Sequence, residues 1–235
     1  MHPALSSPQS IHPSLWRGSQ LAYGCERCVD TGHAALSAEL PGGGWPRGTL
    51  IDFLIQQPGI GEVRLLQPAL ATLSARPIIL LQPPHVPNAL AVANWGVPPD
   101  SLHRIETASV ADALWAAEQI LRADTCGMLL FWQPQIRTEA LRRLHLAAQA
   151  GDTVFFMMRP LTAASHASPA PLRLALTPAF DGVGVRFIKR RGPALEEPLF
   201  VPLFPSLFKS YRHAPVDRRS SSVSVAGNVS ADVVV

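Results

Sequence analysis

Two glycines in a loop between apolar segments are the residues that most clearly suggest chemistry. Gly59 and Gly61 follow the apolar run Thr49–Ile55, which is typical of a buried strand, and precede an apolar helical pattern that reaches Leu70. A strand, a glycine-containing loop and a helix in this order can bind phosphate, because backbone N–H groups and the helix N-terminus converge on the anion. The segment therefore predicts the scaffold of a nucleotide site, although strand–loop–helix units that bind no phosphate also use glycine in their turns.

The sequence around this loop resembles the ATPase core of RecA. In RecA a GGLPRG leader precedes the strand and the phosphate-binding loop, and this chain has GGWPRG at residues 43–48. A second likeness covers residues 79–97, ILLQPPHVPNALAVANWGV, which follow the RecA pattern of a strand, a helix and a Gly-Val turn. The resemblance implies a RecA-like α/β fold.

The side chains that would bind and hydrolyse ATP are absent from the positions that this resemblance assigns. Glu62 takes the place of the phosphate-binding lysine, Val63 that of the magnesium-binding hydroxyl, and Gln56 that of the first loop glycine. Pro84 stands at the position of the catalytic glutamate, and Trp132 ends a strand that should end in a magnesium-binding aspartate. A carboxylate repels phosphate, Pro84 cannot activate or orient a water, and Trp132 cannot bind magnesium. We therefore expect a degenerate site with no catalysis, cofactor or metal.

The elements that would position this site are strands alternating with helices. Several short runs are apolar at nearly every position, which is typical of parallel strands that are buried on both faces. Between these runs, the apolar residues of 110–121 and 141–148 recur at helical spacing. Asp181-Gly182 is a hairpin signal, which predicts antiparallel strands added at the C-terminal side of the sheet. The expected parallel strands are 49–55, 77–81, 127–132 and 153–158.

Length and composition predict one globular domain with loose ends. The chain has 235 residues, of which 47% are hydrophobic, enough for one sizeable core. We expect a flexible N-terminal arm over 1–20, a RecA-like domain over 21–208, and a disordered, low-complexity tail over 209–235. No stretch approaches the roughly 20 apolar residues of a membrane helix. The three cysteines cannot all pair and Cys25-x-x-Cys28 lacks further ligands at metal spacing, so we expect free thiols and a cytoplasmic protein.

Positive charge is concentrated near the C-terminus. Residues 184–219 contain eight lysines and arginines against three acidic residues, whereas the whole chain has a net charge of +3. Such a cluster can attract DNA or an acidic partner, and the aromatic residues within it can anchor an interface. A solvated surface is the alternative interpretation. The candidate contact residues are Arg186, Lys189, Arg190, Arg191, Phe204, Phe208 and Arg212.

The likeness to the ImuA family is more specific than the likeness to RecA. It runs from about Leu15 to about Phe208, and the block PGGGWPRG at residues 41–48 is its most specific part; Ser37 departs from it, because the family has an aspartate there. This resemblance implies a non-catalytic accessory protein of SOS-induced mutagenic translesion DNA synthesis that is associated with the nucleoid when damage is present. The implied partners are ImuB, a polymerase-like protein without activity, and an error-prone DnaE-type polymerase, with RecA as a further candidate. The matching segments are 31–36, 39–48, 57–62, 142–144 and 147–148.

Three other functions remain open on the sequence. The first is a working, weak ATPase with an unusual phosphate-binding loop, which nucleotide titration would reveal. The second is a SulA-type inhibitor of cell division that acts on FtsZ, because SulA is related to this degenerate RecA group. The third is a DNA-binding module whose tryptophans stack on bases, although most of these tryptophans lie in apolar patterns that are typical of a core.

Overall fold

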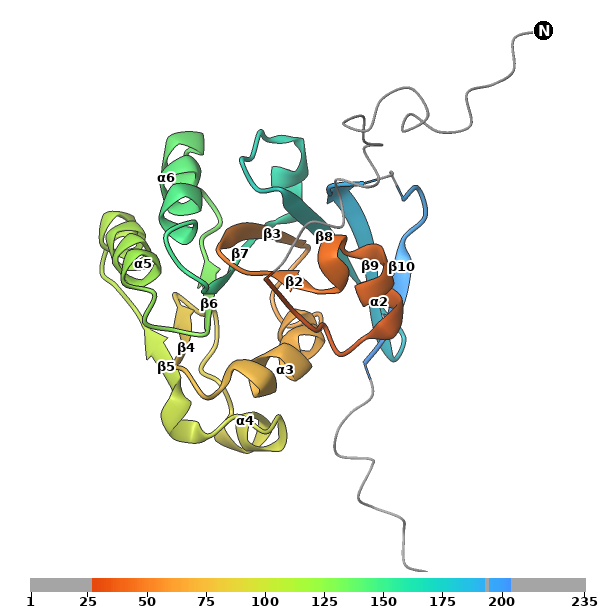
Figure 1. Ribbon diagram of the computed structural model, residues 1–235, viewed down its shortest axis with the longest axis horizontal. Helices are drawn as coiled ribbons and strands as arrows, with labels where there is room; N and C mark the ends of the chain where they lie inside the picture. Colours follow the sequence, from red (N-terminus) through yellow and green to blue (C-terminus); the bar gives the residue numbers. More distant parts are fainter. Residues whose placement is uncertain (1–26, 193–194, 204–235) are drawn as a thin grey trace, which may run out of the picture. The chain divides into compact units, whose positions relative to one another are not determined.

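An eight-stranded, mostly parallel sheet forms the centre of the protein (Figure 1). This computed structural model describes residues 27–192 and 195–203, all of which lie in a compact unit that spans 1–204; a second unit, 205–235, lies outside the described residues. In their order across the sheet the strands are β10 (Leu199–Pro202), β9 (Gly182–Lys189), β8 (Leu172–Ala179), β3 (Thr49–Ile55), β7 (Val154–Pro160), β6 (Met128–Trp132), β4 (Ile78–Leu81) and β5 (Leu102–Ile105).

The pairing of the strands confirms a mixed α/β fold with antiparallel strands at its C-terminal side. From β5 through β4, β6, β7 and β3 to β8 every neighbouring pair is parallel. The last two pairs, β8 with β9 and β9 with β10, are antiparallel. Asp181, with a φ of +55°, makes the tight turn between β8 and β9, as the Asp-Gly pair predicts.

Helices cover both faces of the sheet. Residues of α3 and α4 share one core with the sheet, and residues of α5 and α6 share the other. In Figure 1, α5 and α6 lie side by side along one face. The helices are α2 (Ala34–Glu39), α3 (Glu62–Leu73), α4 (Ala89–Asn94), α5 (Val110–Ala123) and α6 (Thr138–Ala148), and the 3-10 helices are η2 (Pro41–Gly43), η3 (Pro99–Ser101) and η4 (Leu161–Ser165).

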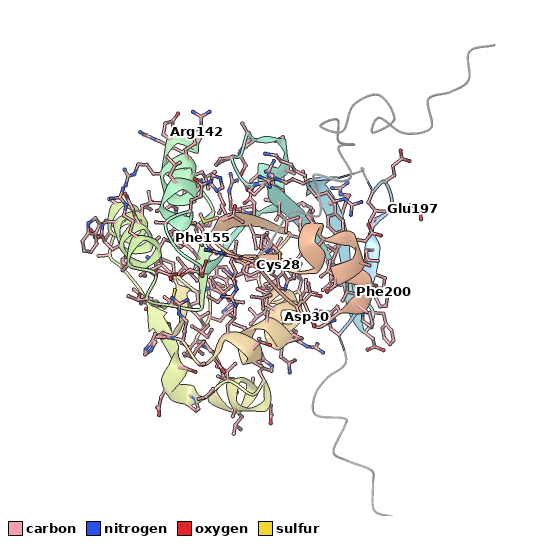
Figure 2. All side chains as sticks on the ribbon, in the orientation of Figure 1. Cys28, Asp30, Arg142, Phe155, Glu197 and Phe200 are labelled. Carbon is pink, nitrogen blue, oxygen red and sulfur yellow. The ribbon has the colours of Figure 1, made fainter. Side chains whose placement is uncertain are left out.

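Strand β3 shows how the sequence builds both layers. Ile51 and Phe53 pack in the core beneath α3, whereas Leu50 packs in the core beneath α5 and α6. Successive side chains of a strand point to opposite faces, so a run that is apolar at nearly every position requires cover on both sides. Phe155 of the neighbouring strand lies inside the protein, while Arg142 projects outward from α6 (Figure 2).

Aromatic residues anchor the layer that contains α3. Trp45 belongs to β2 (Trp45–Pro46), which pairs with β1 (Cys28–Val29) in a small separate sheet. Its ring contacts Phe53 and Phe156 in edge-to-face geometry, with centroid distances of 5.6 and 5.2 Å. Trp45 and Trp132 are buried, which favours the core interpretation of these two tryptophans, whereas Trp115 is 64% exposed. Trp16 lies outside the described residues.

The described residues contain no helix that is both long enough and apolar enough to cross a membrane. The predicted arm over 1–20 and the predicted tail over 209–235 both lie outside the described residues.

Candidate functional site at the carboxyl edge of the sheet

The carboxyl ends of β3, β4, β6 and β7 lie at one edge of the sheet, and the loops that follow them lead to opposite faces. The loops after β3 and β4 lead to α3 and α4 on one face, whereas those after β6 and β7 lead to α6 and η4 on the other. Connections that leave adjacent parallel strands toward opposite faces open a crevice, which is the usual ligand position in open α/β sheets. The predicted nucleotide loop follows β3 at this edge.

The loop between β3 and α3 has the backbone of a tight glycine turn. Gly59 and Gly61 have φ angles of +89° and +112°, in the left-handed region that favours glycine. A Cβ at Gly61 would also lie 2.9 Å from the Leu203 side chain and 3.0 Å from that of Val183. Glycine is therefore favoured at position 61 for two reasons, its left-handed backbone conformation and the close approach of the Leu203 and Val183 side chains.

The side chain of Glu62, the first residue of α3, turns back onto this loop and places a carboxylate there. Glu62 is 2% exposed, and its two carboxylate oxygens accept the backbone N–H of Gly59 at 2.8 and 3.1 Å. The carboxylate thus lies at the positive end of the α3 dipole, where a phosphate-binding loop would place an anion. An incoming phosphate would have to displace the carboxylate or meet its charge.

The positions that the resemblance to RecA assigns to ATP binding and hydrolysis lie close together in space. Glu62 and Val63 from the start of α3, Pro84 from the loop after β4, and Trp132 from the end of β6 line one cavity of about 170 Å³ with Gly59. Most of the lining is apolar, from prolines, Val63 and tryptophan rings. A cavity of this size suits one apolar group about as large as benzene rather than a nucleotide.

A second, larger cavity of about 360 Å³ adjoins the first and shares Pro58, Pro84 and Trp132 with it. Gln56, the residue at the first glycine position of the predicted loop, belongs to this cavity and not to the smaller one. Its remaining lining comes from the ends of β3, β4, β6 and β7: Ile55, Gln57, Gln82, Gln133, Pro134, Met158, Arg159 and Pro160.

A buried ionic cluster beside this cavity was not predicted from the sequence. Oδ2 of Asp52 on β3 accepts hydrogen bonds from Nη1 of Arg159 at 3.1 Å and Nε of Arg173 at 3.0 Å. The three side chains are at most 7% exposed. The available signal was an aspartate in the middle of the apolar strand TLIDFLI, because a buried carboxylate requires a cationic or hydrogen-bonding partner.

The four predicted contact residues that the structure describes are all basic, and they divide into three exposed residues and one buried side chain. Arg186, Lys189 and Arg191 are exposed on or just after β9. The Arg190 side chain is only 8% exposed, because its Nη1 pairs with the Glu39 carboxylate at 2.7 Å and its guanidinium lies 4.8 Å from the Phe187 ring centroid. Arg190 therefore joins β9 to α2, which is a structural role. Phe204, Phe208 and Arg212 lie outside the described residues.

Two of these basic residues face a histidine at the amino edge of the sheet. His145 on α6 has a lowered pKa, first because it is partly buried and then because of the positive charges of Lys189 and Arg191. Its Nδ1 accepts the backbone N–H of Leu50 at 3.4 Å, which requires that nitrogen to be unprotonated. Lys189, Arg191 and His145 thus define a basic region opposite the carboxyl edge.

The two described thiols, Cys28 and Cys126, differ in burial. Burial raises the pKa of Cys126 to about 11, so this side chain stays protonated and packs as a small apolar group. Cys28 is half-buried, and Cys25 lies outside the described residues. Within the described ranges, no three His, Cys, Asp or Glu side chains are grouped so that they could hold a metal ion.

Comparison with known proteins gives a partial match to SulA proteins. No protein-family model matches the chain. A stretch of 76 residues is 32% identical to "Cell division inhibitor SulA" of Edwardsiella piscicida; it covers 32% of this chain and 45% of that protein. The crystal structure of SulA from Pseudomonas aeruginosa aligns with 46% of this chain and 97% of its own, at 21% identity and a TM-score of 0.38. The chain thus spans less than half of its curated relative, and the sequence match supports a distant relationship to SulA proteins.

Proposed function

We propose that this protein is a non-catalytic accessory factor of SOS-induced mutagenic translesion DNA synthesis. It would act by protein contacts with ImuB and with an error-prone DnaE-type polymerase, and RecA is a candidate third partner. In this proposal the RecA-like scaffold positions partner-binding surfaces and does not turn over ATP.

The hydrogen bond between Gly59 and Glu62 carries the non-catalytic part of the proposal. The loop N–H that would bind a phosphate oxygen is paired with a buried carboxylate from the same chain. Val63 supplies no hydroxyl for magnesium, and Pro84 and Trp132 supply no carboxylate at the same cavity. Electrostatic stabilisation of phosphoryl transfer needs cations and a positioned water, and these residues offer neither.

The assignment to translesion synthesis is supported by the ImuA-like motifs that this scaffold carries. The block at residues 41–48 leads from η2 through β2 into β3, directly before the degenerate loop. The partial sequence match to a SulA protein is consistent with this assignment, since the resemblance described in the sequence analysis relates SulA to the same degenerate RecA group.

A second candidate function is inhibition of cell division by binding FtsZ. The observation that favours it is the sequence match to a protein named as a cell division inhibitor. The match covers about one third of this chain, so it leaves most of the domain without a counterpart in that comparison.

Direct binding measurements distinguish the two candidates. The purified full chain is immobilised, and purified ImuB, DnaE-type polymerase, RecA and FtsZ are each passed over it. Retention of ImuB without retention of FtsZ is the expected result. Retention of FtsZ alone would replace the proposed function by the cell-division alternative.

Localisation in living cells gives an independent test. A fluorescent fusion should be cytoplasmic in undamaged cells and should move to the nucleoid after DNA damage. Accumulation at the division site together with filamentous growth, in cells without ImuB, would instead support action on the division machinery.

A further inference from the structure

An open groove lies between the first turns of α5 and α6 and the loop that follows β6. The two helices run side by side (Figure 1). Glu118 of α5 and Arg143 of α6 pair at 2.5 Å and join the helices one turn after the groove-lining residues Leu114 and Ala140. The volume of the groove is about 810 Å³, which is within the range of ligand-binding sites.

The groove exposes apolar side chains to solvent. Val110 is 51% exposed, and Leu114 and Ile136 are only partly covered where they pack on the core beneath α5 and α6. Trp115, which is 64% exposed, comes four residues after the lining residue Ala111 and so lies beside it on the surface of α5. The apolar surface therefore continues past the groove, and contiguous exposed surface of this kind marks interaction sites.

One positive charge accompanies this apolar surface. Arg137 is the charged residue of the lining, and it is exposed and forms no ion pair among the described residues. Asp112 and Glu139, the acidic residues in the first turns of the two helices, do not line the groove. The complementary occupant is therefore apolar with an acidic group. A nucleic acid strand would need several cations for its phosphates.

The residue types at the groove are those of a protein interface. Tryptophan and arginine are the residues that most often dominate binding free energy between proteins, and Trp115 and Arg137 are both exposed here. The groove is also open along its length and merges with the exposed surface of α5, which suits a polypeptide segment.

We propose that this groove binds a segment of a partner protein that carries apolar side chains and an acidic residue. The apolar side chains pack against Val110, Leu114 and Ile136. The acidic side chain pairs with Arg137, and Trp115 extends the contact. The proposal does not depend on the contacts with ImuB and the polymerase, so its failure would leave the proposed function untouched.

Peptide selection with the full chain tests this proposal. A random peptide library displayed on phage is selected on the immobilised protein. We expect the enriched peptides to combine two or more apolar residues with aspartate or glutamate. Enrichment of basic peptides, or of no peptide, would overturn the proposal. A wild-type dimer that Arg137→Glu converts to a monomer would assign the groove to a second copy of the chain and would also overturn it.

The charged contact is located by exchanging charges. Fluorescence anisotropy gives the affinity of one enriched, labelled peptide. Arg137→Glu should weaken its binding about tenfold, as for loss of a hydrogen bond between charged groups. Arg142→Glu, at an exposed arginine of α6 outside the lining, is the matched control and should bind like the wild type. The same peptide with lysine in place of its acidic residue should bind Arg137→Glu more tightly than the wild type. Unchanged affinity in Arg137→Glu would show that the peptide binds elsewhere.

A second pair of variants tests the apolar contact. Val110→Gln should weaken binding of the peptide about fivefold, because an apolar side chain no longer covers the bound segment. Leu146→Gln is the control, since Leu146 is 65% exposed on α6 and does not line the groove. Both positions are more than half exposed, so the fold should persist in both variants. Equal losses at positions 110 and 146 would contradict binding in the groove.

Discussion

Both carboxylate oxygens of Glu62 accept the backbone N–H of Gly59, three residues earlier in the chain, at 2.8 and 3.1 Å. The residue that the resemblance to RecA places at the lysine position thus supplies a carboxylate to its own loop. The contact stabilises the left-handed turn and the start of α3 at once, because it satisfies a loop donor and places negative charge at a helix N-terminus.

Removal of this carboxylate should destabilise the protein. Glu62→Ala leaves the Gly59 N–H without its acceptor, and we expect the free energy of unfolding to fall by about 1–3 kcal/mol. Glu62→Gln keeps one acceptor oxygen and should lose less. Urea denaturation measures both, with Glu139→Ala as the control, because Glu139 also lies in the first turn of a helix but is exposed. Equal effects at positions 62 and 139 would contradict this account.

The buried cluster predicts a larger effect at Asp52. Asp52→Asn keeps the shape of the side chain but leaves two buried guanidiniums without a carboxylate, and the free energy of unfolding should fall by about 3–5 kcal/mol. Asp100→Asn, in exposed η3, should change it by less than about 0.5 kcal/mol. Chemical denaturation gives both values. A small effect at Asp52 would mean that the arginines find other partners in solution.

The sequence predicted the sheet well where strands are buried on both faces, because such strands are apolar throughout. The run 49–55 matches β3, and the Asp181-Gly182 turn joins β8 to β9 as expected. Strand β5, Leu102–Ile105, was missed because it lies at the edge of the sheet, where His103 and Arg104 are exposed and the apolar pattern is broken. Pairing at an edge depends on the neighbouring strand rather than on local sequence.

The sequence indicated which residues lie at the candidate site, but it did not indicate their hydrogen bonds. Alignment of loop and strand ends assigned Glu62, Pro84 and Trp132 to one site, and the structure places them around one cavity. The hydrogen bond between the Gly59 N–H and the Glu62 carboxylate depends on the rotamer of Glu62. The pairing of Asp52 with Arg159 and Arg173 joins residues that are more than 100 positions apart in the chain. Residue types along the chain carry no direct record of such contacts.

His145 predicts a pH dependence of stability. Its pKa in the folded protein is lowered by burial and by Lys189 and Arg191, so the unfolded chain binds a proton more readily. Its contribution to stability is present above the unfolded pKa, near 6.5, and is lost as the pH falls through the lower folded pKa. Urea denaturation between about pH 5 and 7.5 should show stability rising with pH, with a shallower slope in His145→Gln. An identical slope in the variant would exclude His145 as the source.

The basic region at the amino edge should contribute to partner or DNA binding. Lys189→Glu with Arg191→Glu reverses two exposed charges, and we expect weaker binding to ImuB, RecA or single-stranded DNA, with the loss greatest at low salt. The Arg190 side chain is left intact because it joins β9 to α2. The control reverses Arg104 and Arg142, which are also exposed. Binding that is unchanged for all three partners at low salt would show that the region is only a solvated surface.

The wild-type protein should not hydrolyse ATP above background, and Glu62→Lys with Val63→Thr should not restore turnover. These changes supply a phosphate-binding charge and one metal ligand, and they free the Gly59 N–H, so weak nucleotide binding can return. Turnover also needs a carboxylate to hold magnesium and a group to orient the attacking water, and Pro84 and Trp132 provide neither. These groups stabilise one transition state together. Restoring half of them should therefore recover much less than half of the transition-state stabilisation free energy. Phosphate release by wild type and double variant, with magnesium and with or without single-stranded DNA, is the measurement. Multiple turnovers by either protein would show that the catalytic positions lie elsewhere in the chain and that the non-enzymatic function is wrong.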